Sequence, residues 1–107
     1  MRLYIPATPE LLGAYRDAAK IPDDAARILA TDESEEAEYL ALMTAADASV
    51  EMGTKRRVVI VADRPIEYGE IYWSELVALH ADAEPFTDPD DEPGWYGVQE
   101  VAAILGG

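Results

Sequence analysis

The residues with the clearest chemical potential are His80 and Asp82, which lie two positions apart at the end of an apolar run. That run predicts a β-strand, and side chains two positions apart on a strand project from the same face. A histidine beside a carboxylate can act as a general base that the acid orients. The alternative is that His80 only ends the strand and bonds a backbone group or Asp82, because one histidine near many acids is expected by chance.

Other polar side chains are expected near this pair. Asp63 and Arg64 end the neighbouring predicted strand, and Tyr96 and Glu100 lie one helical turn apart near the end of the chain. Ligands of α/β proteins tend to bind beside strand ends. For Glu100 the alternative is a bond to an arginine that holds a docking helix. Side chains that converge on one concave surface form a candidate ligand-binding pocket. The six candidate residues of this pocket are Asp63, Arg64, His80, Asp82, Tyr96 and Glu100.

An aromatic cluster lies in the connection between two predicted strands, at residues 66–75. Its members Tyr68, Tyr72 and Trp73 stand among isoleucines and acidic residues. An exposed aromatic cluster favours a surface for a protein partner, whereas a packed cluster belongs to the core or covers a sheet edge. We therefore take Tyr68, Tyr72 and Trp73 as candidate partner-binding residues.

The sequence lacks the residue patterns of the common cofactor and metal sites. It has no cysteine and one histidine, which excludes thiolate metal sites, a cysteine nucleophile and any site with two histidines. It also lacks the glycine-rich phosphate loops and the G-x-S-x-G turn of a serine nucleophile. The acidic loop at 82–94 has no central glycine for calcium. We predict no cofactor, no metal and no catalytic residue, and we favour a protein that is not an enzyme.

The chain is strongly acidic, with 22 Asp and Glu against 8 Lys and Arg and a net charge of −14. All eight basic residues lie at or before Arg64, so residues 65–107 carry ten acids and no base. Attraction to phosphate supplies most non-specific affinity for nucleic acid, so we expect neither nucleic-acid binding nor attachment to an anionic membrane. A basic protein partner would be attracted. The alternative is an acidic surface that only keeps the protein in solution.

Composition and patterning predict one globular α/β domain over residues 1–107. Half of the 107 residues are apolar, and this length is ordinary for a single domain. Alternating or β-branched runs predict strands, and apolar residues at helical spacing predict helices. In chain order the strands are at 2–6, 26–30, 58–62 and 76–80, and the helices are at 9–20, 34–52 and 95–105.

The order β-α-β-α-β-β-α predicts how these elements pair. Alternating strands and helices favour parallel pairing of the first three strands through helical crossovers. The connection to the last strand is short and lacks helical periodicity, which favours antiparallel addition. We expect a mixed sheet of about four strands that is covered by helices. No apolar run is long enough to span a bilayer, and the N-terminal apolar stretch is too short for a signal peptide.

Five segments follow one another along nearly the whole chain: MRLYIPAT, EEAEYLALMTAA, RRVVIVAD, LVALHAD and WYGVQEVAAIL. Together they resemble a family of small actinobacterial proteins of unknown function, whose members open with M-R-x-Y-x-P-A-T and close with W-Y-x-x-Q-E. The chain has His80-Ala81-Asp82-Ala83 where the family has H-x-D-D, and a proline-rich loop where the family has a longer helical insertion. The missing acid weakens any metal or acid–base role of His80. The resemblance implies a cytoplasmic actinobacterial protein and no particular activity.

We expect the protein to be a non-enzymatic protein-interaction or regulatory module, because it is small, acidic and without a catalytic constellation. The alternative is a small-molecule-binding protein or minor enzyme with a polar pocket around His80 and Asp82. A third hypothesis is an acidic nucleic-acid mimic, with carboxylates spaced like phosphates along the helix at 34–52. An exposed edge strand with the aromatic residues of 66–73 would also allow a two-fold homodimer.

Overall fold

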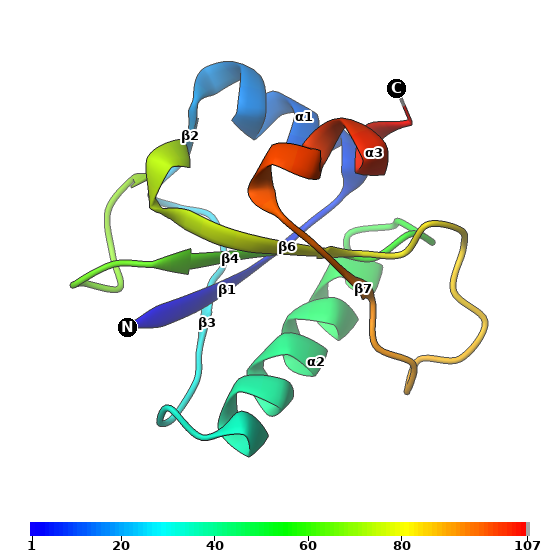
Figure 1. Cartoon of the computed structure of the whole chain (residues 1–107), viewed down its shortest axis with the longest axis horizontal. Coiled ribbons are helices and arrows are strands. Elements are labelled where there is room, and N and C mark those ends of the chain that lie inside the picture. Colours follow the sequence, from blue (N-terminus) through cyan, green and yellow to red (C-terminus); the bar gives the residue numbers. More distant parts are fainter. Residues whose placement is uncertain (107) are drawn as a thin grey trace.

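Five strands form one antiparallel sheet in the order β3-β1-β4-β6-β7 in the computed structural model, which describes residues 1–106 (Figure 1). Helices lie on both faces of this sheet, so the fold is α/β, as predicted. The long strands fall where β-branched and alternating residues predict them, to within one residue. The strands are β1 (Arg2–Ala7), β3 (Ile28–Leu29), β4 (Val58–Asp63), β6 (Leu76–Ala81) and β7 (Gly94–Tyr96).

The predicted mixed sheet of about four strands with parallel pairing is wrong, because every strand pair is antiparallel. The helical crossover after β3 does lead to a strand of the same direction, β4. However, β1 lies between β3 and β4 and pairs with both of them. The alternation of elements therefore predicted the common direction of β3 and β4, but not the opposite direction of β1 or which strands are neighbours. The strand predicted at 26–30 is also reduced to the two residues of β3.

The fifth strand lies where a helix was predicted, at 95–105. Its first residues form β7, and the chain then continues as the short 3₁₀ helix η2 (Val98–Glu100) and the helix α3 (Val101–Leu105). The helix begins late because the backbone at Gly97 is extended, with φ −68° and ψ 154°, and the Glu100 carboxylate accepts a hydrogen bond from the Gly97 amide at 2.8 Å. The helix was predicted to begin at Trp95 because apolar residues recur at helical spacing from that position.

The other two helices form close to where capping residues predict them. In α1 (Pro9–Ala18) the Thr8 hydroxyl accepts a hydrogen bond from the Leu11 amide, and Pro9 occupies the first position. Helix α1 ends earlier than predicted because Ala19 adopts a left-handed conformation with φ 60°. Helix α2 (Glu35–Glu51) begins after Ser34, whose hydroxyl caps the helix.

Two short strands form a second, small antiparallel sheet beside the end of α1. They are β2 (Lys20–Ile21) and β5 (Ile71–Tyr72), and the 3₁₀ helix η1 (Trp73–Glu75) joins β5 to β6. Ile21 and Ile71, which pair across this sheet, are fully buried in the main core. The connection at 66–75 therefore contains one short strand, β5.

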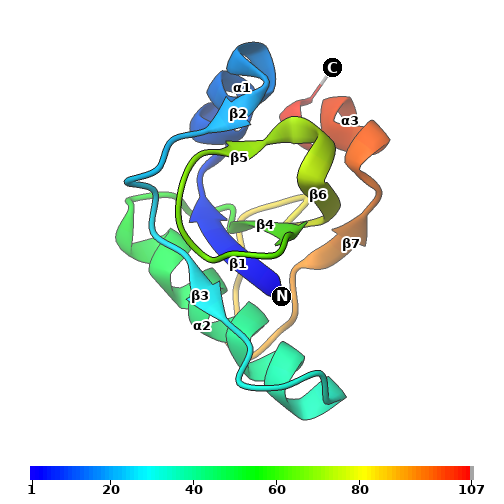
Figure 2. The same cartoon turned by 90° about the vertical axis from the view of Figure 1, so that its left-hand side faces the viewer.

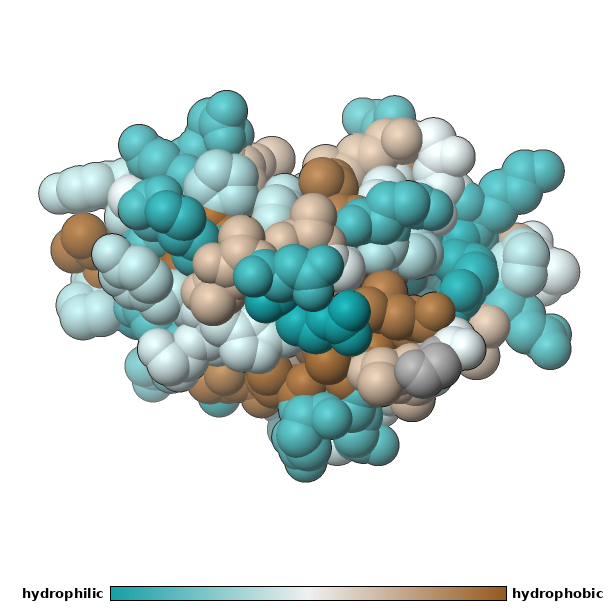
Figure 3. Space-filling model, turned by 90° about the horizontal axis from the view of Figure 1, so that it is seen from above, coloured by the Kyte–Doolittle hydropathy of each residue, from teal (hydrophilic) through white to brown (hydrophobic). Residues whose placement is uncertain are grey.

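The main sheet buries a hydrophobic core on each face. On one face, Leu3, Ile5 and Ile60 pack with Leu12 of α1 and Ile104 of α3. On the other face the strands pack against α2 through small alanines, which bring the helix close to the sheet. Figure 3 shows the α1 and α3 side, where apolar side chains appear between polar ones.

Helix α2 covers its face of the sheet unevenly. Its main strand contacts are with β1, β4 and β3, whereas β7 lies at the opposite edge of the sheet (Figure 2). One helix is about 10 Å wide with its side chains, so it spans only about two strands of a sheet. The part of this face that belongs to β6 and β7 is therefore available for a surface site.

Candidate functional site

The six residues of the predicted ligand pocket lie against different partners. The carboxylate of Asp63 is 3.5 Å from the N-terminal ammonium group. Arg64 donates hydrogen bonds to the Glu75 carboxylate at 3.2 Å and to the Tyr68 carbonyl at 2.6 Å. These two neighbours in sequence, the last residue of β4 and the residue that follows it, are therefore engaged in separate structural contacts.

Asp82 is held by Arg57. Its carboxylate accepts hydrogen bonds from Arg57 Nε at 2.8 Å, Nη2 at 3.0 Å and the backbone amide at 2.9 Å. The Arg57 side chain is 1% exposed and that of Asp82 is 9% exposed. The Arg57 guanidinium also lies 4.7 Å from the centre of the Phe86 ring. The hydrogen bonds that Arg57 donates to the Asp82 carboxylate raise the pKa of Arg57. This carboxylate fastens the loop at 82–93 to the sheet.

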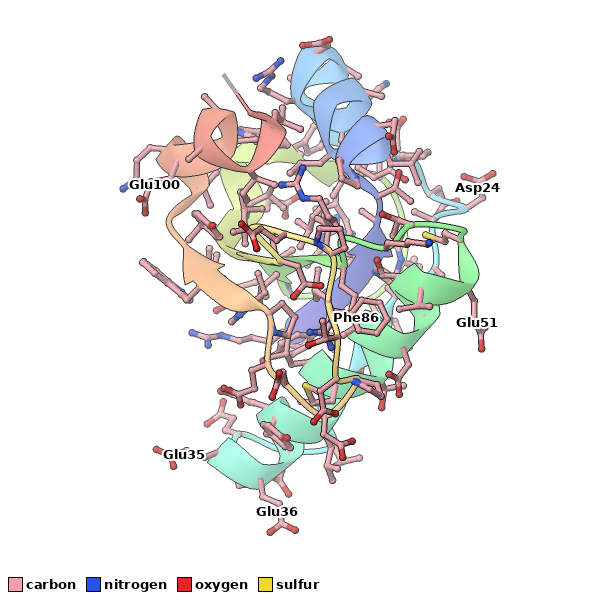
Figure 4. All side chains as sticks on the ribbon, turned by 90° about the vertical axis from the view of Figure 1, so that its right-hand side faces the viewer. Asp24, Glu35, Glu36, Glu51, Phe86 and Glu100 are labelled. Carbon is pink, nitrogen blue, oxygen red and sulfur yellow. The ribbon has the colours of Figure 1, made fainter. Side chains whose placement is uncertain are left out.

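Glu100 and Tyr96 also have structural partners. Glu100 caps the turn at Gly97, as described above, rather than bonding an arginine. The half-buried Tyr96 packs against the core on the α1 and α3 face. Figure 4 shows Glu100 at the α3 end of the molecule, far from Glu35 at the start of α2. The structure therefore does not bring the six candidates together at one surface.

The predicted partner-binding residues are divided between surface and core. Tyr68 is 67% exposed and Tyr72 is 54% exposed, whereas Trp73 is half-buried against the core. We call residues 66–72 the tyrosine loop. Arg27 and Arg64 hold this loop in place, since Arg27 Nη1 donates to the carbonyls of residues 67 and 69 at 2.9 Å each. The loop therefore presents its two tyrosines on a well-anchored backbone.

A hollow on the α2 face contains the residues that best resemble a binding site. It lies between α2 and the outer strand β7 and has a volume of about 280 Å³. We call it the β7 groove. Its aromatic side chains are Trp95, Tyr39, His80 and the buried Tyr4, and its acidic side chains are Glu35, Glu38 and Glu92.

Sheet register explains the position of the aromatic residues. His80 of β6 pairs directly with Trp95 of β7, so both side chains project to the same face. Tyr39 approaches from α2 on the other side of the groove and is 43% exposed. Ala78, two positions before His80, also lines the groove. Because the Ala78 side chain is small, it leaves space between the aromatic side chains of the groove.

Trp95 is the most exposed aromatic residue of the groove, at 65%. An indole exposed to this extent leaves most of its apolar surface in contact with water. Tryptophan is enriched at the centres of protein interfaces, where burial of its ring contributes much of the binding energy. The groove therefore combines an exposed anchor residue with a concave surface beside it.

The groove is acidic overall. Of the charged residues in its lining, three are glutamates and one is Arg2, whose Nη1 lies 3.8 Å from a carboxylate oxygen of Glu38. Burial, together with the charge of Glu38, raises the pKa of Tyr4. Burial lowers the pKa of His80 below its ordinary value of 6.5, although the Pro93 carbonyl and Glu92 oppose this shift. His80 is therefore neutral near pH 7.

The sequence analysis identified His80 but missed Trp95 and Tyr39 as site residues. Both lie in segments that were predicted as helices, at 34–52 and 95–105. The signal that would have found Trp95 is its position between Gly94 and Gly97, because two glycines close together weaken a helix prediction.

Neither a metal site nor a membrane span is found in the described part of the chain. Within residues 1–106 no three His, Asp or Glu side chains are grouped so that they could hold a metal ion. Within the same residues, no helix combines the length and the apolar character needed to cross a bilayer.

Comparison with known protein families gives a match over nearly the whole chain. Residues 1–105 match the family of unknown function DUF6912, which confirms the resemblance to a family of unknown function. No curated protein and no solved structure matches the chain significantly. The family description states no activity, so a function must be argued from the surface of this chain.

Proposed function

The chain belongs to DUF6912, a family of unknown function, and we propose that this member is a non-enzymatic protein-binding module. In this proposal the β7 groove binds a basic segment of a partner protein. The observation that carries the proposal is the position of Trp95, which is 65% exposed on an edge strand beside three glutamates. The cytoplasmic location and actinobacterial origin implied by the sequence resemblance are part of this proposal.

Charge favours a basic partner. The chain has a net charge of −14, and the groove itself has three carboxylates against one guanidinium. Such a field attracts positively charged partners and raises their rate of association. Arginine and lysine side chains also bind favourably over the face of an indole ring. Trp95 and the surrounding glutamates therefore suit the same kind of side chain.

The shape of the groove favours a protein segment over a small molecule. Small-molecule sites typically enclose about 300–1,000 Å³ and bury most of the ligand. The β7 groove has about 280 Å³ and leaves Trp95 mostly exposed. A pocket around His80 and Asp82 has less support as an alternative, because the Asp82 carboxylate is already bonded to Arg57.

The experiment is a calorimetric titration of the protein with a short peptide that alternates arginine and valine. A peptide with citrulline in place of arginine keeps the shape and removes the charge. We expect the arginine peptide to bind and the citrulline peptide to bind at least about tenfold more weakly. This corresponds to a difference in binding free energy of more than about 1.4 kcal/mol, which results from the loss of the arginine charges.

Two variants locate the binding site. Trp95→Ala is expected to weaken binding by about tenfold or more, as for an interface anchor. Tyr68→Ala is the matched control, because Tyr68 is 67% exposed, almost the same as Trp95, but lies in the tyrosine loop. Absence of binding, equal binding of both peptides, or a loss caused by Tyr68→Ala and not by Trp95→Ala would each overturn the proposal.

A further inference from the structure

We infer that the partner segment binds as an additional β-strand along the free edge of β7. This inference rests on the proposed function of the β7 groove and specifies how the groove would be used. Strand β7 ends the order of the main sheet and pairs with β6 on one side, and no strand within residues 1–106 pairs with its other side. An edge strand presents backbone amides and carbonyls that can pair with an extended segment.

The free edge lies directly beside the groove. Gly94 and Trp95 are exposed, and Trp95 projects from the same sheet face as His80. A segment that pairs with β7 would therefore place every second side chain over the groove, next to Trp95. Glu92 lies in the lining of the groove, just before the strand. Long basic side chains at these positions would lay their apolar stems along the indole and their charges near the carboxylates.

The intervening side chains of the added strand would face the other side of the sheet. There Gly94 pairs with Ala81, and the half-buried Tyr96 pairs with Leu79. A Cβ atom at Gly94 would come no closer than 3.5 Å to the rest of the chain, and its φ is not positive, so neither packing nor backbone conformation requires glycine. The missing side chain leaves room for a small apolar side chain of the partner.

The length of β7 sets the length of the pairing. The strand has three residues, and the amide of Gly97 directly after it is already bonded to the Glu100 carboxylate. Proline at 93 directly before the strand has no amide hydrogen. Alternate residues of a strand direct their backbone groups to opposite edges. The register turns the groups of Gly94 and Tyr96 towards β6, so the Trp95 amide and carbonyl are the ones that would pair. The side chains over Trp95 would supply the remaining affinity.

A second copy of the chain is a weaker candidate for this edge than a basic segment. Two β7 strands side by side would each carry the acidic segment that precedes the strand, at 82–92. That segment has six acids, and the chain has no Lys or Arg after Arg64. Like charges repel one another and disfavour self-pairing.

The test uses backbone methylation of the arginine–valine peptide. One version carries N-methyl groups on the arginine residues and the other on the valine residues. In an added strand the amides of alternate residues point towards β7, so one version loses its hydrogen bonds while the other keeps them. We expect one methylated peptide to bind about tenfold or more weakly than the unmodified peptide, and the other to bind within about threefold of it.

The outcomes separate the inference from the proposed function. If the unmodified peptide binds and the two methylated peptides bind the protein with equal affinity, strand addition is wrong, while a site for a basic segment stands. If the unmodified peptide does not bind, the proposed function itself is wrong. Size-exclusion chromatography with light scattering tests whether a second copy of the chain binds the β7 edge instead. A stable dimer that Trp95→Ala converts to monomer would assign this edge to a second copy and overturn the inference.

Discussion

The substitution Asp82→Ala is expected to destabilise the protein strongly, because it removes one partner of a buried ion pair. The Asp82 carboxylate accepts three hydrogen bonds from Arg57, at 2.8, 2.9 and 3.0 Å. Without it, a guanidinium that is 1% exposed keeps one hydrogen bond, to the Pro89 carbonyl at 3.3 Å, the Phe86 ring, and the more distant charges of Asp47 and Asp91. A buried charge cannot be left unpaired without a large cost in free energy.

The size of the effect follows from the burial of the pair. Removing one partner from a buried ion pair costs about 3–5 kcal/mol. The free energy of unfolding of a domain of this size is about 5–15 kcal/mol, so the variant loses a large part of its stability. With a urea dependence of about 1–3 kcal/mol per molar, the unfolding midpoint falls by more than about 1 M.

The assay is urea unfolding followed by circular dichroism, with two controls. Glu70→Ala removes an ion pair of similar length, since Lys20 Nζ lies 3.0 Å from a Glu70 oxygen, but both side chains are exposed. Such a pair is worth about 0–1 kcal/mol. Arg57→Met combined with Asp82→Leu removes both charges, and is expected to be more stable than Asp82→Ala because no buried charge is left alone.

The reasoning would be refuted by a simple result. If Asp82→Ala loses no more stability than Glu70→Ala, then the Arg57 guanidinium is solvated without its partner and the loop at 82–93 is not fixed by this pair. If the double substitution is no more stable than Asp82→Ala, the loss does not come from an unpaired charge.

Two further effects are expected on stability. Ser49→Ala removes a fully buried hydroxyl that donates to the Ala7 carbonyl at 2.6 Å and accepts from the Val58 amide at 3.1 Å. Losing these two buried hydrogen bonds is expected to lower the free energy of unfolding by about 2 kcal/mol, measured by urea unfolding. A loss no larger than that for changing an exposed serine to alanine would contradict this. Burial of neutral His80 lowers its pKa, so the unfolded chain binds more protons. The free energy of unfolding therefore falls as the pH falls from above 6.5 through the pKa of the folded state. His80→Gln should remove this dependence between about pH 7.5 and 5.5, where few other side chains titrate; an unchanged slope would contradict the assignment.

The sequence predicted those elements that local chemistry determines. Thr8 and Pro9 placed the start of α1, and the β-branched run after Arg57 placed β4. Helix α2 was also found within one residue at each end. In each case the signal lies within a few neighbouring residues, where capping and side-chain periodicity act.

Pairing across long sequence distances could not be predicted in the same way. The position of β1 between β3 and β4 depends on contacts between segments that are far apart in the chain. The strand β7 forms because Trp95 pairs with His80, which overrides the helical spacing of the apolar residues that follow. Tertiary pairing of this kind commonly decides the state of a short segment against its local preference.

In the candidate site, too, local sequence predicted some features, while contacts between distant residues decided others. His80 lies in the β7 groove, but its expected companion Asp82 is bonded to Arg57, which is 25 positions away in sequence. The tyrosine loop has two exposed tyrosines, whereas Trp73 packs against the core. Which aromatic or acidic side chain is free depends on partners that the local pattern does not reveal.

The most direct test of a basic-segment site in the β7 groove is a proton–nitrogen NMR titration of the labelled protein with the arginine–valine peptide. The two tryptophans give separate indole signals, which Trp95→Phe assigns. We expect the largest shifts at the Trp95 indole, at the amides of β7 and in the first turns of α2. Largest shifts in the tyrosine loop, or only small shifts spread over the whole chain, would contradict the proposed site.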